Sequence, residues 1–153
     1  MNVYLIRHGD AVSAAENAER PLSALGRQQA AHAARAIVEH DAAVLQIYHS
    51  GILRARQTAE IICQMLDLDP APVVEPYAGL LPEDDPAIVS AELDGLDHSI
   101  ALVGHLPYMR RLAGLLVYGD PETAAVDFLP ATVLCCSRFG ERWKINWISA
   151  FGR

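Results

Sequence analysis

The sequence predicts an α/β fold: a three-layer α/β/α sandwich with a mostly parallel central sheet and an antiparallel edge strand. Short apolar segments alternate with longer segments in which apolar residues recur at helical spacing, which is typical of parallel strands joined by helices. Residues 3–6 and 100–103 are continuously apolar, as central strands covered on both faces are. Residues 132–139 and 143–148 resemble a hairpin around Gly140, which predicts antiparallel pairing near the C-terminus.

The first half of the chain contains two further helices and one further strand. Ser23 is a suitable N-cap for a helix that runs toward His40. Residues 44–48 form the second predicted strand. A helix from about Leu53 ends before Pro70, because proline cannot continue a helix.

The second half repeats this alternation. We expect a short strand at residues 73–75, and a helix at residues 86–93 after an acidic loop that contains proline. Another helix begins near Pro107, directly after the strand at residues 100–103. In the last strand apolar and polar residues alternate, so we expect one packed face, formed by Trp143, Ile145 and Trp147.

The composition describes an acidic, folded domain. The 153 residues are 52% hydrophobic and 20% charged, which suits a single domain over residues 1–153. A net charge of −7 argues against nucleic-acid or anionic-membrane partners, which select basic surfaces. An anionic ligand would therefore need a local arginine cluster. Seven arginines lie in a few short stretches: Arg7, Arg20, Arg27, Arg54, Arg56, Arg110 and Arg111.

The cysteines and the apolar segments indicate the compartment. Cys63, Cys135 and Cys136 are odd in number, and two are adjacent, so they do not form a disulfide framework. A reducing compartment is the simpler interpretation. We see no signal-peptide pattern and no apolar run near the roughly 20 residues of a membrane span. We expect a cytoplasmic monomer.

Three chemistry-bearing segments follow predicted strands. Arg7-His8-Gly9 follows the first strand, residues 50–54 follow the second, and Gly104-His105 follows the strand at residues 100–103. In a parallel sheet, ligands bind beyond the carboxyl ends of the strands, so these segments should meet there. A cation, an imidazole and a flexible glycine at one edge are suited to attack on a phosphoryl group.

The residue types predict a division of roles. Arginine forks pair with phosphate oxygens, so Arg7 and Arg54 would clamp the group, while His105 would donate another hydrogen bond near a helix N-terminus. His8 would be the nucleophile, kept neutral by the neighbouring guanidinium groups. Attack would give a phosphohistidine that water hydrolyses. We expect no cofactor and no metal, since the arginines supply the counter-charge and no familiar ligand motif is present.

Four ordered blocks resemble the histidine phosphatase superfamily, and within it the small SixA-type phosphohistidine phosphatases. The blocks cover residues 5–10, 20–26, 50–58 and 103–107. The resemblance implies a phosphoglycerate mutase-like fold. It also implies that His8 is phosphorylated, that Arg7 and Arg54 bind phosphate, that His105 completes the pocket, and that Arg20 lines its rim.

The resemblance further implies a substrate. Family members of this type remove phosphate from a histidine on a partner protein, so we expect a phosphohistidine-bearing phosphotransfer protein from a phosphorelay or related system. Larger members of the superfamily carry insertions that roof the site. This chain is too short for such a lid, so an open pocket that admits a protein-borne group is expected.

This chain differs from larger members of the superfamily in its general acid, for which they use a carboxylate. The candidates are Glu83, Asp84 and Asp85, and we interpret this loop as a solvated acidic turn, in which case alcohol phosphates should be poor substrates. Two alternatives to a phosphohistidine phosphatase remain open. One is a phosphatase for small phosphate monoesters, and the other is a non-catalytic module that binds phosphorylated partners.

Overall fold

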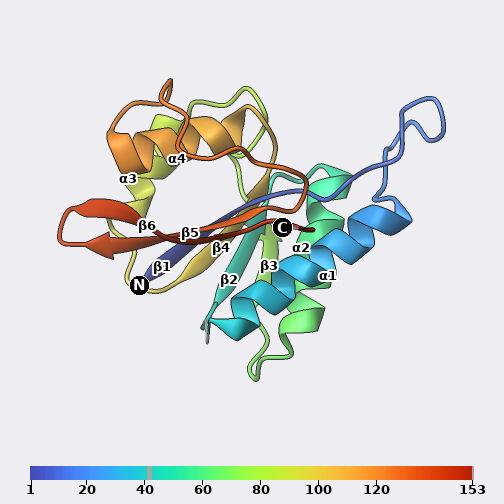
Figure 1. Ribbon diagram of the computed structural model, residues 1–153, viewed down its shortest axis with the longest axis horizontal. Helices are drawn as coiled ribbons and strands as arrows, with labels where there is room; N and C mark the ends of the chain where they lie inside the picture. Colours follow the sequence, from blue (N-terminus) through green and yellow to red (C-terminus); the bar gives the residue numbers. More distant parts are fainter. Residues whose placement is uncertain (41–42, 153) are drawn as a thin grey trace.

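A six-stranded sheet forms the middle of the molecule in the computed structural model (Figure 1), which describes residues 1–40 and 43–152. The strand order is β3-β2-β4-β1-β5-β6. The strands are β1 (Asn2–Arg7), β2 (Gln46–His49), β3 (Val73–Pro76), β4 (Ile100–Gly104), β5 (Val133–Phe139) and β6 (Arg142–Ser149). The helices are α1 (Ala24–Glu39), α2 (Leu53–Leu66), α3 (Pro86–Leu93) and α4 (Tyr108–Tyr118).

The helices cover both faces of the sheet, which confirms the three-layer prediction. Helices α1 and α2 pack on one face and α3 and α4 on the other (Figure 1). Alternate residues of each central strand face the two layers. In β1, Val3 and Leu5 belong to the α3–α4 cluster, whereas Tyr4 and Ile6 belong to the α1–α2 cluster. The adjacent Cys135 and Cys136 divide in the same way and are free thiols.

The sheet is parallel except at its C-terminal side. Strands β3, β2, β4 and β1 are parallel neighbours, β5 runs antiparallel to β1, and β6 antiparallel to β5. The reversed strand β5 therefore lies inside the sheet and β6 forms the edge. The phosphoglycerate mutase-like arrangement that we expected is the one observed. None of the described helices is both long and apolar enough to cross a membrane.

The packing of β6 differs from its sequence pattern. A bulge opposite Cys135 and Cys136 makes Asn146 an extra residue, because Ile145 pairs with Cys136 and Trp147 with Cys135. Trp143 therefore packs in the α3–α4 layer, whereas Trp147 lies on the other face and stacks on His40 at 4.0 Å. Ile145 is 39% exposed. The expectation of one shared packed face was wrong, since alternation holds only while pairing is uninterrupted.

Candidate active site

The parallel strands bring the three predicted segments to one edge of the sheet. Arg7 at the end of β1 pairs in register with Gly104 at the end of β4, and His49 at the end of β2 pairs with Val103. The His8 backbone N–H also donates to the Gly104 carbonyl oxygen at 2.9 Å. Residues that follow these strands therefore lie together.

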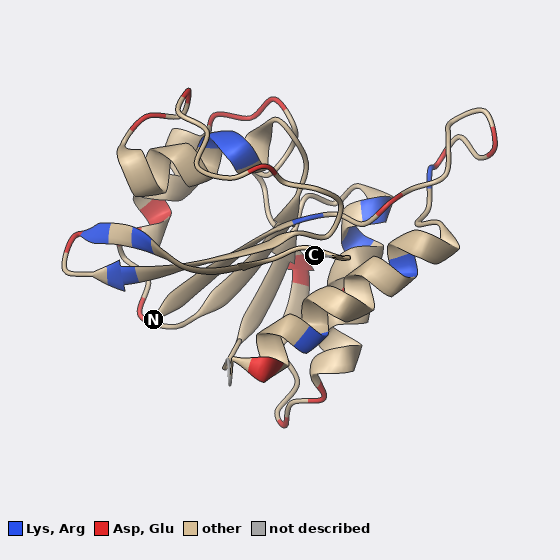
Figure 2. Cartoon of the chain, viewed as in Figure 1, with Lys and Arg blue, Asp and Glu red and all other residues tan. Residues whose placement is uncertain are grey.

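Basic residues gather near the same edge. Figure 2 shows them at the end of β1 and near the starts of α1, α2 and α4, with a separate group on the β5–β6 hairpin. None of the four helices has an acidic residue in its first turn. A helix N-terminus favours acidic groups, and α2 and α4 also have no side-chain cap, so the starts of these two helices can attract another anion.

The ring of His8 is oriented by its own loop. Its Nδ1–H donates to the Gly9 carbonyl oxygen at 2.7 Å, which leaves the lone pair of Nε2 available. Burial lowers the pKa of His8 to about 4, and the charges of Arg54, Arg7 and Arg20 act in the same direction. His8 is thus a neutral imidazole at neutral pH, which is the form that a nucleophile requires.

His105 lies against His8, with ring centroids 5.0 Å apart and the planes tilted by 54°. The side chain is 2% exposed, and its Nε2 lies 2.6 Å from Ser50 Oγ. Burial is the main cause that lowers the pKa of His105 to about 3, and His8, Arg54 and Arg7 are further causes. Both histidines are therefore neutral neighbours.

Each of the two predicted phosphate-binding arginines has a buried nitrogen atom without a hydrogen-bond partner among the described residues. One terminal N–H of Arg7 donates to the Phe128 carbonyl oxygen at 2.9 Å. Among the described residues, however, Arg7 Nε, Arg54 Nε and His105 Nδ1 are buried without a hydrogen-bond partner. Buried polar nitrogens are normally paired. These three nitrogens on neighbouring residues are therefore suited to binding an anion, whose oxygens accept hydrogen bonds.

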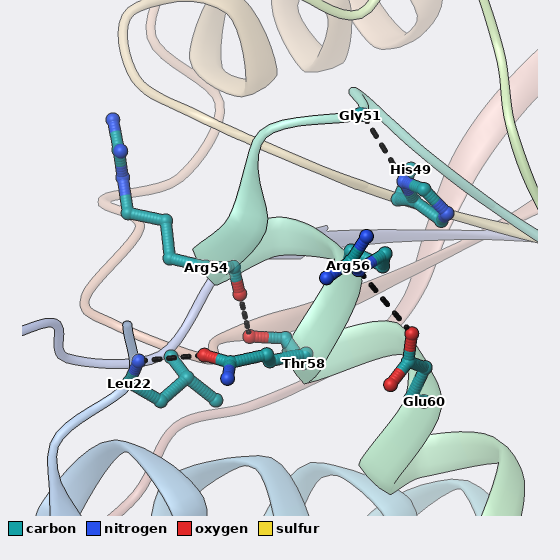
Figure 3. A network of polar contacts seen from close by, with 8 residues as sticks. Leu22, His49, Gly51, Arg54, Arg56, Thr58 and Glu60 are labelled. Carbon is teal, nitrogen blue, oxygen red and sulfur yellow. Dashed lines mark hydrogen bonds and ion pairs between the residues drawn. The ribbon is translucent and has the colours of Figure 1, made fainter. Parts of the chain in front are cut away.

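Arg54 and Arg56 lie on the same helix but point in different directions (Figure 3). Arg56 forms a half-exposed ion pair with Glu60 at 3.4 Å, as expected of a surface residue. Arg54 extends away from that pair, and burial lowers its pKa, with the charge of Arg20 as a further cause. Only Arg54 therefore shares the environment of the two histidines.

Arg20 lies in the loop between β1 and α1. Its backbone has a φ of 49°, and its Nε donates to the Val12 carbonyl oxygen at 3.0 Å. Its charge contributes to the lowered pKa of both His8 and Arg54. Arg20 is therefore near enough to act on both groups, and its place on the rim stays a prediction.

Three side chains hold the β1–α1 loop in place, and the sequence did not assign these roles. Thr58 Oγ1 accepts the Gly9 N–H at 3.1 Å. It also donates to the Arg54 carbonyl oxygen at 2.8 Å (Figure 3). Gln29 Oε1 accepts the Asp10 N–H, and Gln57 Oε1 accepts the Leu22 N–H, both at 2.8 Å. The only sequence signal was the spacing of Thr58, one helical turn after Arg54.

Close backbone contact fixes the same loop against α1. A Cβ atom on Gly26 would lie 2.0 Å from the Asp10 carbonyl oxygen, and one on Gly9 would lie 2.6 Å from the Gly26 carbonyl oxygen. Neither position has room for a side chain. The loop that carries His8 and the start of α1 therefore form one packed unit.

The candidate general acids have local structural roles. Asp84 Oδ2 accepts the Leu81 N–H at 2.9 Å, and Asp85 Oδ1 accepts the Ala87 N–H at 3.0 Å as the N-cap of α3. Glu83 is exposed. No carboxylate is among the groups that shift the pKa of His8 or His105 in the described chain. The interpretation of residues 83–85 as an acidic turn agrees with these contacts, and a general-acid role remains only a prediction.

Comparison with known proteins shows similarity to the histidine phosphatase superfamily. The profile of the histidine phosphatase superfamily (branch 1) matches residues 3–75. The phosphohistidine phosphatase SixA of Escherichia coli (strain K12) is 32% identical over 125 residues, which cover 78% of this chain and 76% of that protein. An uncharacterized protein of Picosynechococcus sp. is 32% identical over 127 residues, covering 78% of this chain and 75% of its own.

A solved structure agrees over nearly the full length. The protein histidine phosphatase SixA complexed with tungstate superposes with a TM-score of 0.84 and 27% identity. The match covers 98% of this chain and 97% of that one.

Proposed function

Because this chain belongs to the histidine phosphatase superfamily, we propose that it is a metal-independent protein phosphohistidine phosphatase. The family establishes a phosphatase of the histidine phosphatase type. The proposal adds the substrate, which is a phosphorylated histidine on a partner protein such as a phosphotransfer domain. The observation that carries it is the neutral His8, whose Nε2 lone pair is available. His8 lies near buried guanidinium nitrogens that have no acceptor among the described residues.

The first step transfers the phosphoryl group to His8. Nε2 attacks phosphorus in line, an N–P bond forms, and the bond from phosphorus to the substrate imidazole breaks. Arg7 and Arg54 balance the charge on the equatorial oxygens, and each such preorganised donor stabilises the transition state by about 3 kcal/mol. The departing imidazole keeps the electron pair and takes a proton from solvent.

The second step restores the enzyme. Water attacks phosphorus of phospho-His8, the N–P bond breaks toward Nε2, and inorganic phosphate leaves. The same arginines neutralise the same oxygens in both steps, so one pocket serves both. His8 returns to its neutral form with Nδ1–H on Gly9.

The leaving group favours a phosphohistidine substrate over an alcohol phosphate. An alcohol leaves poorly unless an acid protonates it, and Asp84 and Asp85 are engaged with backbone N–H groups. An imidazole leaves more readily because it can be protonated before or during cleavage. The similarity to SixA supports the same choice.

The decisive test compares substrates. The wild-type protein should release phosphate from a phosphohistidine phosphotransfer domain with chelator present, and far more slowly from sugar or aryl phosphates. His8→Ala should abolish release, and retained turnover in that variant would end the proposal. Comparable turnover of simple monoesters would favour the small-molecule alternative. Phosphate binding without any labelling of His8 would indicate a non-catalytic module.

A further inference from the structure

A short side-chain hydrogen bond between Ser50 and His105 joins two strand ends of this site. Ser50 follows β2 directly, and its Oγ lies 2.6 Å from His105 Nε2, on the segment after β4. The same Oγ accepts the Ile52 N–H at 3.2 Å, and His49 Nδ1 accepts the Gly51 N–H at 3.0 Å. The turn that carries Ser50 is thus fixed by its own hydrogen bonds.

Hydrogen-bond accounting favours one direction for the Ser50–His105 contact. A hydroxyl has one proton to donate, and Ser50 Oγ has no other acceptor among the described residues. If Ser50 donates to Nε2, its proton is used and its oxygen still accepts from Ile52. The neutral His105 ring then carries its own proton on Nδ1. If Nε2 carried the proton instead, the Ser50 proton would be unused.

The environment of Nδ1 supports the same assignment. This atom is buried without a partner among the described residues, as are Arg7 Nε and Arg54 Nε. Phosphoryl oxygens only accept hydrogen bonds, so a bare Nδ1 lone pair would repel them, whereas an Nδ1–H would donate.

We propose that Ser50 is a positioning residue that holds His105 in the Nδ1–H tautomer, so that His105 donates a hydrogen bond to the phosphoryl group. This inference rests on the proposed function for its purpose, but the tautomer is a property of the free protein. Ser50 itself does not touch the reacting atoms. It acts through the imidazole, as partners of metal-bound histidines do.

The direct test is nitrogen NMR of protein labelled with ¹⁵N-histidine. In the wild-type protein the His105 resonances should show a protonated Nδ1 and an unprotonated Nε2. In Ser50→Ala the two tautomers should mix or reverse, and in Ser50→Thr, which keeps a hydroxyl, the wild-type pattern should return. A wild-type His105 with its proton on Nε2 would overturn the proposal, whatever the substrate of the enzyme proves to be.

Kinetics and oxyanion binding supply the second readout. Ser50→Ala should lower kcat by about 10- to 100-fold, the range for losing a partner that orients a functional imidazole. It should also weaken the binding of tungstate, and Ser50→Thr should recover both. Ser13→Ala is the matched control, because Ser13 Oγ likewise accepts a backbone N–H, from Glu16 at 3.2 Å, without contacting a histidine.

The outcomes separate this inference from the proposed function. If phosphohistidine is not turned over but the tautomer and the tungstate affinity respond to Ser50→Ala, the substrate is wrong and the positioning role stands. If Ser50→Ala leaves tautomer, tungstate binding and kcat unchanged, the positioning role is wrong. If Ser50→Ala does not fold, the wild-type tautomer and the Ser50→Thr variant still decide.

Discussion

The two helical layers contact the same sheet but contribute differently to the site. The α1–α2 layer packs through small residues such as Ala33, Ala34, Ala55 and Ala59, and it supplies the polar side chains that hold the β1–α1 loop. The α3–α4 layer packs through large residues, among them Met109 and Leu112. Small residues allow α1 and α2 to pack closely. Polar side chains of these two helices then hold backbone N–H groups of the β1–α1 loop by short hydrogen bonds.

Both layers contain buried polar atoms without a partner among the described residues, and in the α1–α2 layer these include His32 Nδ1 and Arg54 Nε. In the α3–α4 layer, Tyr108 Oη and Trp143 Nε1 are buried without a partner among the described residues. In the α1–α2 layer, Thr58 is fully buried and has both a donor and an acceptor. The α1–α2 layer therefore fixes the loop that carries His8, whereas the α3–α4 layer supplies large apolar side chains and begins just after His105. The comparison can be tested by substitutions paired between or within the layers.

Among substitutions that compare the two layers, the largest effect on activity should come from Arg54 of α2. If Arg54 binds the phosphoryl oxygens as proposed, Arg54→Ala should lower kcat/KM by about 10²- to 10³-fold. Arg56→Ala, two residues away on the same helix, removes only a surface ion pair and should change kcat/KM little. Steady-state kinetics on a phosphohistidine protein measures both, and equal losses would mean that Arg54 is not distinguished from the surface.

A glycine in each layer sharpens the comparison. Gly26→Ala forces the Asp10 carbonyl oxygen away from a 2.0 Å contact, so the nucleophile loop should shift and kcat should fall by about 100-fold. Gly114→Ala in α4 creates a similar clash, 2.3 Å from the Thr123 carbonyl oxygen. It should lower the melting temperature while leaving kcat of the folded fraction near that of wild type. A kcat loss as large as that of Gly26→Ala would remove the distinction between the layers.

The pH dependence tests the electrostatics of the two histidines. Burial lowers the pKa of His8 to about 4 and of His105 to about 3, so both stay neutral until the pH approaches 4. Phosphoryl transfer should therefore persist at pH 5.5, unlike that of an enzyme whose histidine has an ordinary pKa near 6.5, and fall as the pH drops through about 4.

Stability should respond over a different pH window. The unfolded chain protonates both histidines below about pH 6.5, whereas the folded protein does so only near pH 4 and below, so stability falls as the pH decreases between these limits. His8→Gln should make the decrease in the free energy of unfolding between pH 7 and pH 5 shallower. Urea unfolding at the two pH values measures this, and an unchanged slope would contradict the lowered pKa of His8.

The smallest effect on activity should come from a pair of buried threonines. Thr58→Val removes the acceptor of the Gly9 N–H and should cost about 1–3 kcal/mol in the free energy of unfolding, with a modest decrease in kcat. Thr132→Val is the control, because Thr132 Oγ1 is equally buried but has no partner among the described residues. It should be neutral or slightly stabilising. Equal destabilisation of both variants would show that the Thr58 hydrogen bonds contribute nothing specific.

Sequence periodicity was sufficient to predict which segments form strands and that the three segments meet at one edge of the sheet. The apolar runs of β1 and β4, the Ser23 N-cap and the start of α3 at Pro86 are local features, and each is found where the sequence predicted it. Arg7, His8 and His105 could be grouped because parallel strands align their carboxyl ends. Their roles remain a proposal.

The features that were missed depend on tertiary contacts. Ser50 lies 55 residues from His105, and Thr58 lies 49 residues from Gly9, so no local pattern reveals either hydrogen bond. The β6 bulge was missed for a related reason. Trp143, Ile145 and Trp147 keep a regular alternation in the sequence, and only the pairing with β5 shows that Asn146 interrupts it.

The bulge in β6 has an experimental use. The chain contains two tryptophans, and the bulge places Trp143 in the α3–α4 layer and Trp147 against His40 and Tyr4 in the α1–α2 layer. Each indole therefore emits from a different side of the sheet. Single-tryptophan variants would report the fluorescence of each layer separately, so a refolding experiment could establish whether the α1–α2 layer forms before, with or after the α3–α4 layer.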